Sequence, residues 1–115
     1  MTILYAIPNC NTVKKARTWL EENNIEYDFH NYKKQGIDES SLKQWVAEFG
    51  WETIINRKGM TWRKLDEDTR NNMNSEKAIA IMLENQSIIK RPLIIHNDRK
   101  ILGFNEAEYQ EFFNG

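Results

Sequence analysis

The sequence predicts an α/β fold in which a β-α-β unit and a later β-β-α unit are separated by an all-helical insertion. An apolar run at residues 3–7 is followed at once by an apolar stripe at helical spacing. A hairpin pattern occupies residues 93–102. Between the second and third strands, residues 37–87 carry only helical patterns. We therefore expect a single domain over residues 1–115 with a helical insertion at about 37–87.

The N-terminal unit begins with a strand that ends at Pro8, because proline cannot donate to a strand ladder. The apolar stripe then predicts a helix from about Thr12 to Glu22. Residues 27–32 alternate apolar and polar, which is typical of a strand with one covered face. The two strands of such a unit are expected to be parallel. His30 lies on the polar phase of the second strand, so we expect a solvated side chain and not a catalytic base.

Loop and capping residues divide the helical insertion. Residues 33–36 are expected to form a loop, and Asp38 to cap a helix that Gly50 ends. Thr61 is expected to cap a short helix, and Ser75 a longer one.

The C-terminal unit reads as an antiparallel hairpin followed by a helix. The hairpin turns at Asn97 and Asp98, and Gly103 ends it. Asn105 with Glu108 three residues later resembles a capping box for the last helix.

Composition limits the function. The net charge of −1 and the pI near 6.1 give no bulk signature of nucleic-acid binding. No apolar run approaches the roughly 20 residues that span a membrane, and the first residues lack a signal-peptide pattern. One cysteine excludes an internal disulfide, and two distant histidines make a metal site improbable. We expect a cytoplasmic monomer without a bound metal or cofactor.

The single cysteine, Cys10, lies where the first strand gives way to the first helix. The unpaired N–H groups and positive dipole end of a helix stabilise a thiolate. The polar neighbours Asn11 and Thr12 and the lysines 14 and 15 favour an accessible thiol. The alternative is an inert thiol packed as a small hydrophobic group. The local chemistry favours a reactive cysteine.

The order of elements, with a cysteine at the first helix and a proline before the third strand, resembles the thioredoxin fold. A narrower resemblance rests on spaced motifs: Tyr5, Cys10, Thr12 and Lys15; Asn56-Arg57-Lys58-Gly59; Lys90-Arg91-Pro92-Leu93; and Gly103-Phe104. Together these resemble the arsenate reductase (ArsC)-like family, and within it the subgroup of YffB and, more distantly, the regulator Spx. The resemblance is nearest to YffB and covers essentially the whole chain.

The resemblance implies a set of site residues. The nucleophile is Cys10, whose thiolate is assisted by the helix terminus and by Thr12. The planar forks of Arg57 and Arg91 would hold an oxyanion, although from the residues alone the alternative is a solvated surface arginine or a salt-bridge partner. The full set is catalytic Cys10 and Thr12, anion-binding Asn11, Arg57 and Arg91, and structural Pro92, as a cis-proline, and Pro8.

Two departures from the family pattern refine this expectation. Arsenate reductases carry a third arginine where this chain has Gly103, which weakens arsenate as the substrate. Regulators of the Spx kind use a C-x-x-C switch, and here the fourth position is Val13. The protein is therefore a monothiol, and an external thiol must resolve any adduct on Cys10.

The leading hypothesis is a glutathione-dependent thiol reductase, with glutathione as co-substrate and a small thiol or oxyanion as the other substrate. One alternative is a true arsenate reductase. Another is a non-catalytic, Spx-like regulator that docks on a protein such as RNA polymerase. Neither nucleic acid nor membrane is expected as a partner.

Overall fold

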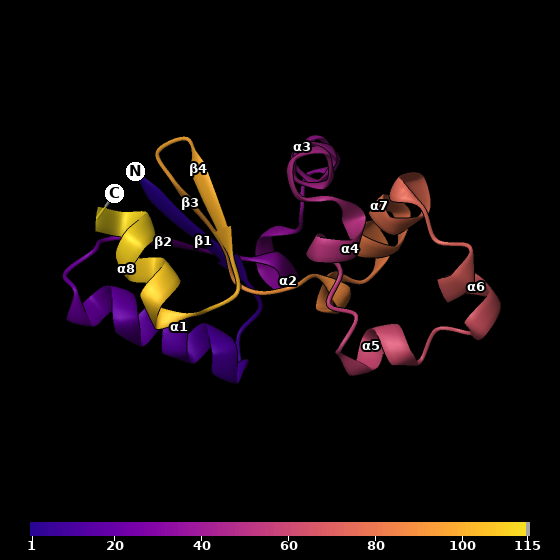
Figure 1. Ribbon diagram of the computed structural model, residues 1–115, viewed down its shortest axis with the longest axis horizontal. Coiled ribbons are helices and arrows are strands. Elements are labelled where there is room, and N and C mark those ends of the chain that lie inside the picture. Colours follow the sequence, from indigo (N-terminus) through magenta and orange to yellow (C-terminus); the bar gives the residue numbers. More distant parts are fainter. Residues whose placement is uncertain (115) are drawn as a thin grey trace. The chain divides into compact units, whose positions relative to one another are not determined.

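The computed structural model describes residues 1–114, and the chain divides into two compact units (Figure 1). The sheet unit comprises Met1–Gln35 and the residues from Arg91 onward, and the helical unit comprises Gly36–Lys90. Within residues 1–114, no helix has both the length and the apolar character that a membrane span requires.

The sheet unit contains a four-stranded sheet with the strand order β2-β1-β3-β4. Both predicted halves, β-α-β and β-β-α, are present, and the thioredoxin-like α/β fold is confirmed. The elements are β1 (Thr2–Ala6), α1 (Asn11–Glu22), β2 (Asp28–Asn31), α2 (Tyr32–Gln35), β3 (Leu93–His96), β4 (Arg99–Leu102) and α8 (Glu106–Asn114).

The strand register brings three chain segments to one edge of the sheet. β1 and β2 are parallel, as predicted, with Tyr5 opposite His30 and Ala6 opposite Asn31. β1 and β3 are antiparallel, with Tyr5 opposite Leu93. The carboxyl ends of β1 and β2 therefore meet the amino end of β3.

One face of the sheet carries the core of this unit. Leu4 and Ala6 are fully buried there, and Figure 1 shows α1 and α8 together on this side of the sheet. The Trp19 ring meets the Tyr109 ring edge-on, with 5.4 Å between centroids. Each large apolar side chain buried in this way contributes about 1.5–3 kcal/mol. The buried members of the cluster are Leu4, Ala6, Val13, Ala16, Trp19, Leu20, Ile94 and Tyr109.

The hairpin and the last helix follow the predicted turns. Asn97 has φ 56°, a left-handed conformation that asparagine tolerates. Asn105 caps α8, since its Oδ1 accepts from the Glu108 N–H at 3.0 Å. Gly103 has φ 77°, and its N–H donates to the Pro92 carbonyl at 2.8 Å. Its own carbonyl accepts from the Tyr109 hydroxyl at 2.5 Å, so Gly103 joins β3, β4 and α8.

The helical unit is a set of short helices around a buried aromatic and aliphatic core. Trp45 of α3 is 1% exposed, and Met82 of α7 is fully buried. Asp38 caps α3, with its Oδ2 accepting from the Ser41 N–H at 3.1 Å, and Gly50 (φ 83°) ends it, both as predicted. The elements are α3 (Glu39–Phe49), α4 (Trp51–Ile54), α5 (Met60–Arg63), α6 (Glu67–Asn71), α7 (Ser75–Glu84) and the 3-10 helix η1 (Gln86–Ile88).

Two predicted helix caps are wrong, each because a neighbouring residue takes the position. Thr61 lies inside α5, whose N-cap is Gly59. A Cβ at Gly59 would lie 2.8 Å from Asn56 Nδ2, so any other residue there would displace the Asn56 side chain. Ser75 is the first residue of α7, and Asn74 caps it by accepting from the Lys77 N–H at 2.9 Å.

Two further local predictions are corrected. Residues 33–35 do not belong to a loop, because Tyr32–Gln35 forms the short helix α2 directly after β2, and of the predicted loop only Gly36 lies outside the helix. The segment between the second and third strands is also not entirely helical. Ile55 pairs with Ile89 in an isolated antiparallel bridge, and the Lys90 N–H donates to the Ile54 carbonyl at 2.8 Å.

Candidate active site

Cys10 is the N-cap residue of α1, at the end of the turn that follows β1. Its backbone is extended, with φ −114° and ψ 126°, and its carbonyl accepts from the Lys14 N–H at 3.0 Å. Asn9 before it has φ 64°, which lets the chain reverse between strand and helix. The thiol is free and half-buried. The sequence thus sets the sulfur on the first turn of a helix, where backbone N–H groups are unpaired.

The surroundings of the sulfur favour the thiolate. Burial raises the pKa of the Cys10 thiol, but the nearby Val13 N–H, the Arg91 guanidinium and the Thr12 N–H lower it. The positive charge of Arg91 acts in the same direction. The resulting pKa lies below the ordinary value of a cysteine, so more thiolate is present at neutral pH.

Arg91 reaches the sulfur from the amino end of β3. It precedes Leu93, which pairs with Tyr5 of β1, and β1 leads directly to the turn that carries Cys10. The Arg91–Pro92 peptide bond is cis, as expected, and Pro92 is buried. The hydrogen bond from Gly103 to the Pro92 carbonyl fixes this segment to the end of the hairpin.

Three aromatic rings gather at the same edge of the sheet. The Tyr5 ring lies 4.7 Å from the His30 ring and 6.2 Å from the Tyr32 ring, centroid to centroid. His30 and Tyr32 meet edge-on at 5.9 Å. His30 is therefore half-buried against tyrosines, and the prediction of a solvated histidine is wrong. Tyr32 is not among the residues that the sequence predicts for the site, although it directly follows β2, whose end lies beside the end of β1.

Three other predicted site residues, Asn11, Thr12 and Pro8, lie exposed on either side of Cys10 in the sequence. Asn11 and Thr12 are the exposed first residues of α1, and the Thr12 N–H helps to lower the pKa of the Cys10 thiol. Pro8 is exposed in the turn before Cys10. The structure joins Cys10 and Arg91, whereas side-chain roles for Asn11, Thr12 and Pro8 stay predictions.

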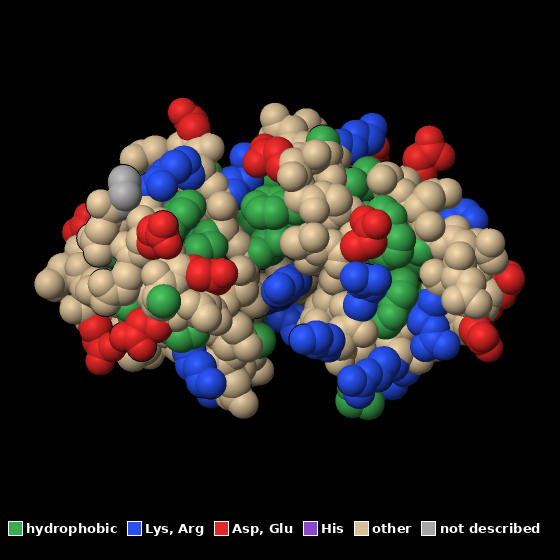
Figure 2. All heavy atoms as spheres, in the orientation of Figure 1, with side chains coloured by type: hydrophobic (Ala, Val, Ile, Leu, Met, Phe, Trp, Pro, Cys, Tyr) green, Lys and Arg blue, Asp and Glu red, His purple; other side chains and the backbone are tan. Residues whose placement is uncertain are grey.

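Arg57 belongs to the helical unit. It is exposed, and its guanidinium carbon lies 6.0 Å from the centre of the Trp51 ring. Residues 57–64 hold four Lys or Arg and no acidic residue, and Figure 2 shows basic side chains gathered over α5. This is a setting that attracts anions. The role of Arg57 toward the thiol stays a prediction.

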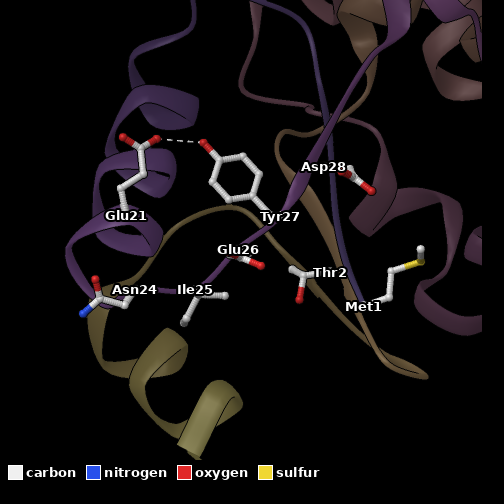
Figure 3. Close-up of a pocket in the computed structure, with 8 residues that line it drawn as sticks. All are labelled: Met1, Thr2, Glu21, Asn24, Ile25, Glu26, Tyr27 and Asp28. Carbon is white, nitrogen blue, oxygen red and sulfur yellow. Dashed lines mark hydrogen bonds between the residues drawn. The ribbon is translucent and has the colours of Figure 1, made fainter.

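A hollow of about 970 Å³ lies at the opposite end of β1 from Cys10 (Figure 3). Its rim carries three carboxylates, from Glu21, Glu26 and Asp28, and Glu21 accepts a hydrogen bond from the Tyr27 hydroxyl at 2.9 Å. The carboxylates repel anions, so this hollow does not suit an anionic ligand. The lining residues are Met1, Thr2, Glu21, Asn24, Ile25, Glu26, Tyr27 and Asp28.

Metal ligands are not grouped in the described part of the chain. Across residues 1–114, no cluster of three or more His, Cys, Asp or Glu side chains could hold a metal ion.

Comparison with known proteins identifies the family. The ArsC family matches residues 5–112. The solved structure of the YFFB (PA3664) protein is 47% identical, covers 96% of this chain and 97% of its own, and has a TM-score of 0.91. An arsenate reductase (ArsC) related protein from Brucella melitensis is 41% identical, covers 99% of this chain and 95% of its own, and has a TM-score of 0.81.

A regulator is also among the relatives. The global transcriptional regulator Spx of Streptococcus mutans is 31% identical over 97% of this chain and 82% of its own length. The family match spans both the cysteine turn and the segment of Arg91 and Pro92. The chain belongs to the ArsC family.

Proposed function

We propose that the protein is a glutathione-dependent monothiol reductase with Cys10 as the nucleophile. The observation that carries this proposal is the position of Cys10 at the N-cap of α1, where the Arg91 guanidinium and the N–H groups of the first turn lower the pKa of its thiol. These donors favour the thiolate, which is the form that attacks a disulfide. A thiol that only packs against its neighbours does not require donors that stabilise the thiolate.

The proposed reaction proceeds in two exchanges. The Cys10 thiolate attacks the glutathione sulfur of a mixed disulfide, which releases the substrate as a thiolate and leaves glutathione on Cys10. The thiolate of a second glutathione then attacks that glutathione sulfur, so oxidised glutathione leaves and the Cys10 thiolate returns. Both electrons come from glutathione, and the released thiolates take protons from water. The external thiol is required because Cys10 is the single cysteine of the chain.

In this proposal, cations and backbone donors bind the anionic part of the substrate. Arg91 can offer further N–H groups of its fork to a carboxylate or oxyanion beside the sulfur. Asn11 and Thr12 are proposed as further polar contacts at the start of α1. Arg57 is proposed as a second cation on the strength of the sequence motif.

Arsenate is proposed to be a poor substrate. Gly103 occupies the position of the family's third arginine and adopts φ 77°, a conformation that strains residues with a Cβ. It is also buried. A charged side chain at this position is therefore disfavoured by the backbone itself, and the site has one cation fewer for a multiply charged oxyanion.

A second candidate is a binding protein of the Spx kind. The 31% identity to Spx over nearly the whole chain favours it. In this case the chain would dock on a protein such as RNA polymerase, and Cys10 would sense oxidants or be unused. Under the enzymatic proposal, the chain acts as a cytoplasmic monomer with glutathione as its main partner.

The test is steady-state reduction of a glutathione mixed disulfide of a small thiol, coupled to glutathione reductase. We expect turnover that saturates with glutathione, together with an arsenate reduction rate at least about tenfold lower. The pH profile of Cys10 alkylation by iodoacetamide is the companion measurement. An alkylation midpoint at or above the ordinary thiol pKa, with no turnover, would refute the enzymatic proposal in favour of the binding protein.

A further inference from the structure

The hydroxyl of Tyr32 is a buried polar group without a hydrogen bond. The side chain is 1% exposed, and within residues 1–114 no group accepts from or donates to this hydroxyl. A buried polar group in this condition costs about 1–3 kcal/mol relative to one that is paired. Tyr32 therefore makes the folded state less stable than phenylalanine would. Core packing alone does not explain why a tyrosine occupies this position.

The hydroxyl belongs to the edge of the sheet that carries the thiol. Tyr32 follows β2 directly, its ring is stacked with Tyr5 at 6.2 Å and 27°, and Tyr5 pairs with Leu93 in β3. Arg91 lies two residues before Leu93 and donates to the Cys10 sulfur. These groups all belong to the sheet unit.

The electrostatic surroundings keep this hydroxyl in its donor form. Burial and the neighbouring Tyr5 hydroxyl raise the pKa of Tyr32 far above its ordinary value, and the Arg91 charge only partly opposes them. Tyr32 is therefore protonated throughout the physiological range. Its O–H can donate to an acceptor that approaches Arg91.

We propose that the Tyr32 hydroxyl is a hydrogen-bond donor to the anionic group that Arg91 holds beside Cys10. The ligand group is one that only accepts hydrogen bonds, a carboxylate or a small oxyanion, since the guanidinium and the hydroxyl both donate. This inference rests on the proposed function only for the presence of an anionic ligand group, and it adds a specificity-determining residue to that site.

Protection of Cys10 by sulfate tests the inference. The rate of iodoacetamide alkylation is measured at pH 7 against sulfate concentration, with ionic strength held constant by chloride. We expect the half-protecting sulfate concentration to rise about tenfold in Tyr32→Phe, the equivalent of about 1.4 kcal/mol. Tyr27→Phe is the matched control, because its hydroxyl bonds Arg17 and Glu21 beside the acidic hollow.

Two further readouts separate recognition from packing. The alkylation midpoint of Cys10 should not move in Tyr32→Phe, since Tyr32 is not among the groups that set the thiol pKa. The melting temperature should be equal to or above that of the unmodified protein, because an unpaired hydroxyl has been removed.

Specific outcomes would overturn the inference. Equal sulfate protection in Tyr32→Phe and the unmodified protein would refute it, as would a loss of protection accompanied by a lower melting temperature and a shifted thiol midpoint. Lack of protection by sulfate in the unmodified protein would refute it as well. Failure of mixed-disulfide reduction with sulfate protection intact would instead refute the proposed function and leave the role of Tyr32 standing.

Discussion

The sheet unit and the helical unit supply their charged groups in different ways. In the sheet unit, Arg91 is half-buried, lies two residues before β3 and lowers the pKa of the Cys10 thiol. In the helical unit, Arg57 is exposed and rests against the Trp51 ring. A strand edge fixes the position of a guanidinium, whereas an exposed turn supplies charge with little positional constraint. We therefore expect Arg91 to lower the pKa of the Cys10 thiol and Arg57 to strengthen substrate binding.

The largest expected effect is the loss of turnover in Cys10→Ser. A hydroxyl at this position stays protonated at neutral pH and cannot exchange with a disulfide, so mixed-disulfide reduction should fall to background. Circular dichroism should match that of the unmodified protein, because Cys10 is half-buried at a helix start. Residual turnover above background would show that Cys10 is not the nucleophile.

The next effect concerns stability and compares the two cores. Leu4→Ala in the sheet unit should lower the free energy of unfolding by about 2–5 kcal/mol, and Trp45→Ala in the helical unit by about 3–5 kcal/mol. Both side chains are at most 1% exposed. Urea unfolding followed by far-ultraviolet circular dichroism measures both. A loss below about 1 kcal/mol at either position would mean that the unit concerned relaxes around the cavity.

The features that the sequence predicts well are those that depend on neighbouring residues. The hairpin turn at Asn97, the cap at Asp38 and the helix end at Gly50 each follow from the local chemistry of one or two side chains. The caps at Gly59 and Asn74 were missed because adjacent residues with similar capping ability compete. Only the finished turn decides between them, as the close approach of Asn56 to Gly59 illustrates.

The features that the sequence predicts poorly depend on register between distant strands. The pairing of Tyr5 with His30 and with Leu93 assembles the aromatic edge, and no local pattern encodes it. The sequence alone therefore predicts a solvated His30, and no local pattern marks Tyr32 as a residue of the site. Arg91 was placed at the site through resemblance to a family, and its hydrogen bond to the sulfur supports that assignment.

A smaller effect compares the two arginines directly. Arg91→Gln removes a guanidinium that lowers the pKa of the Cys10 thiol, so the alkylation midpoint should rise and the alkylation rate at pH 6.5 should fall. Arg57→Gln should leave the midpoint unchanged and raise KM for the mixed disulfide. Equal shifts of the alkylation midpoint in both variants would show that Arg57 and Arg91 lower the thiol pKa to the same extent.

The smallest effect separates the units by their response to acid. Burial, the N-terminal ammonium and Arg99 lower the pKa of His96 in the sheet unit, whereas residues 36–90 contain no histidine. The His96 Nδ1 also lies 2.7 Å from the Thr2 hydroxyl oxygen, within hydrogen-bond distance. Because the folded state disfavours the charged imidazole, this group's contribution to stability is complete above the unfolded pKa near 6.5. It is lost as the pH falls below that value.

The urea midpoint should therefore decrease between pH 7 and pH 5.5, and His96→Gln should reduce that decrease. Both proteins should carry Cys10→Ser, because a thiol with a lowered pKa also loses stability as the pH falls through that pKa. Hydrogen exchange at the two pH values should locate the loss in β1 and β3 and leave α3 and α7 unchanged. A decrease of equal size in His96→Gln would mean that groups other than His96 carry the acid response.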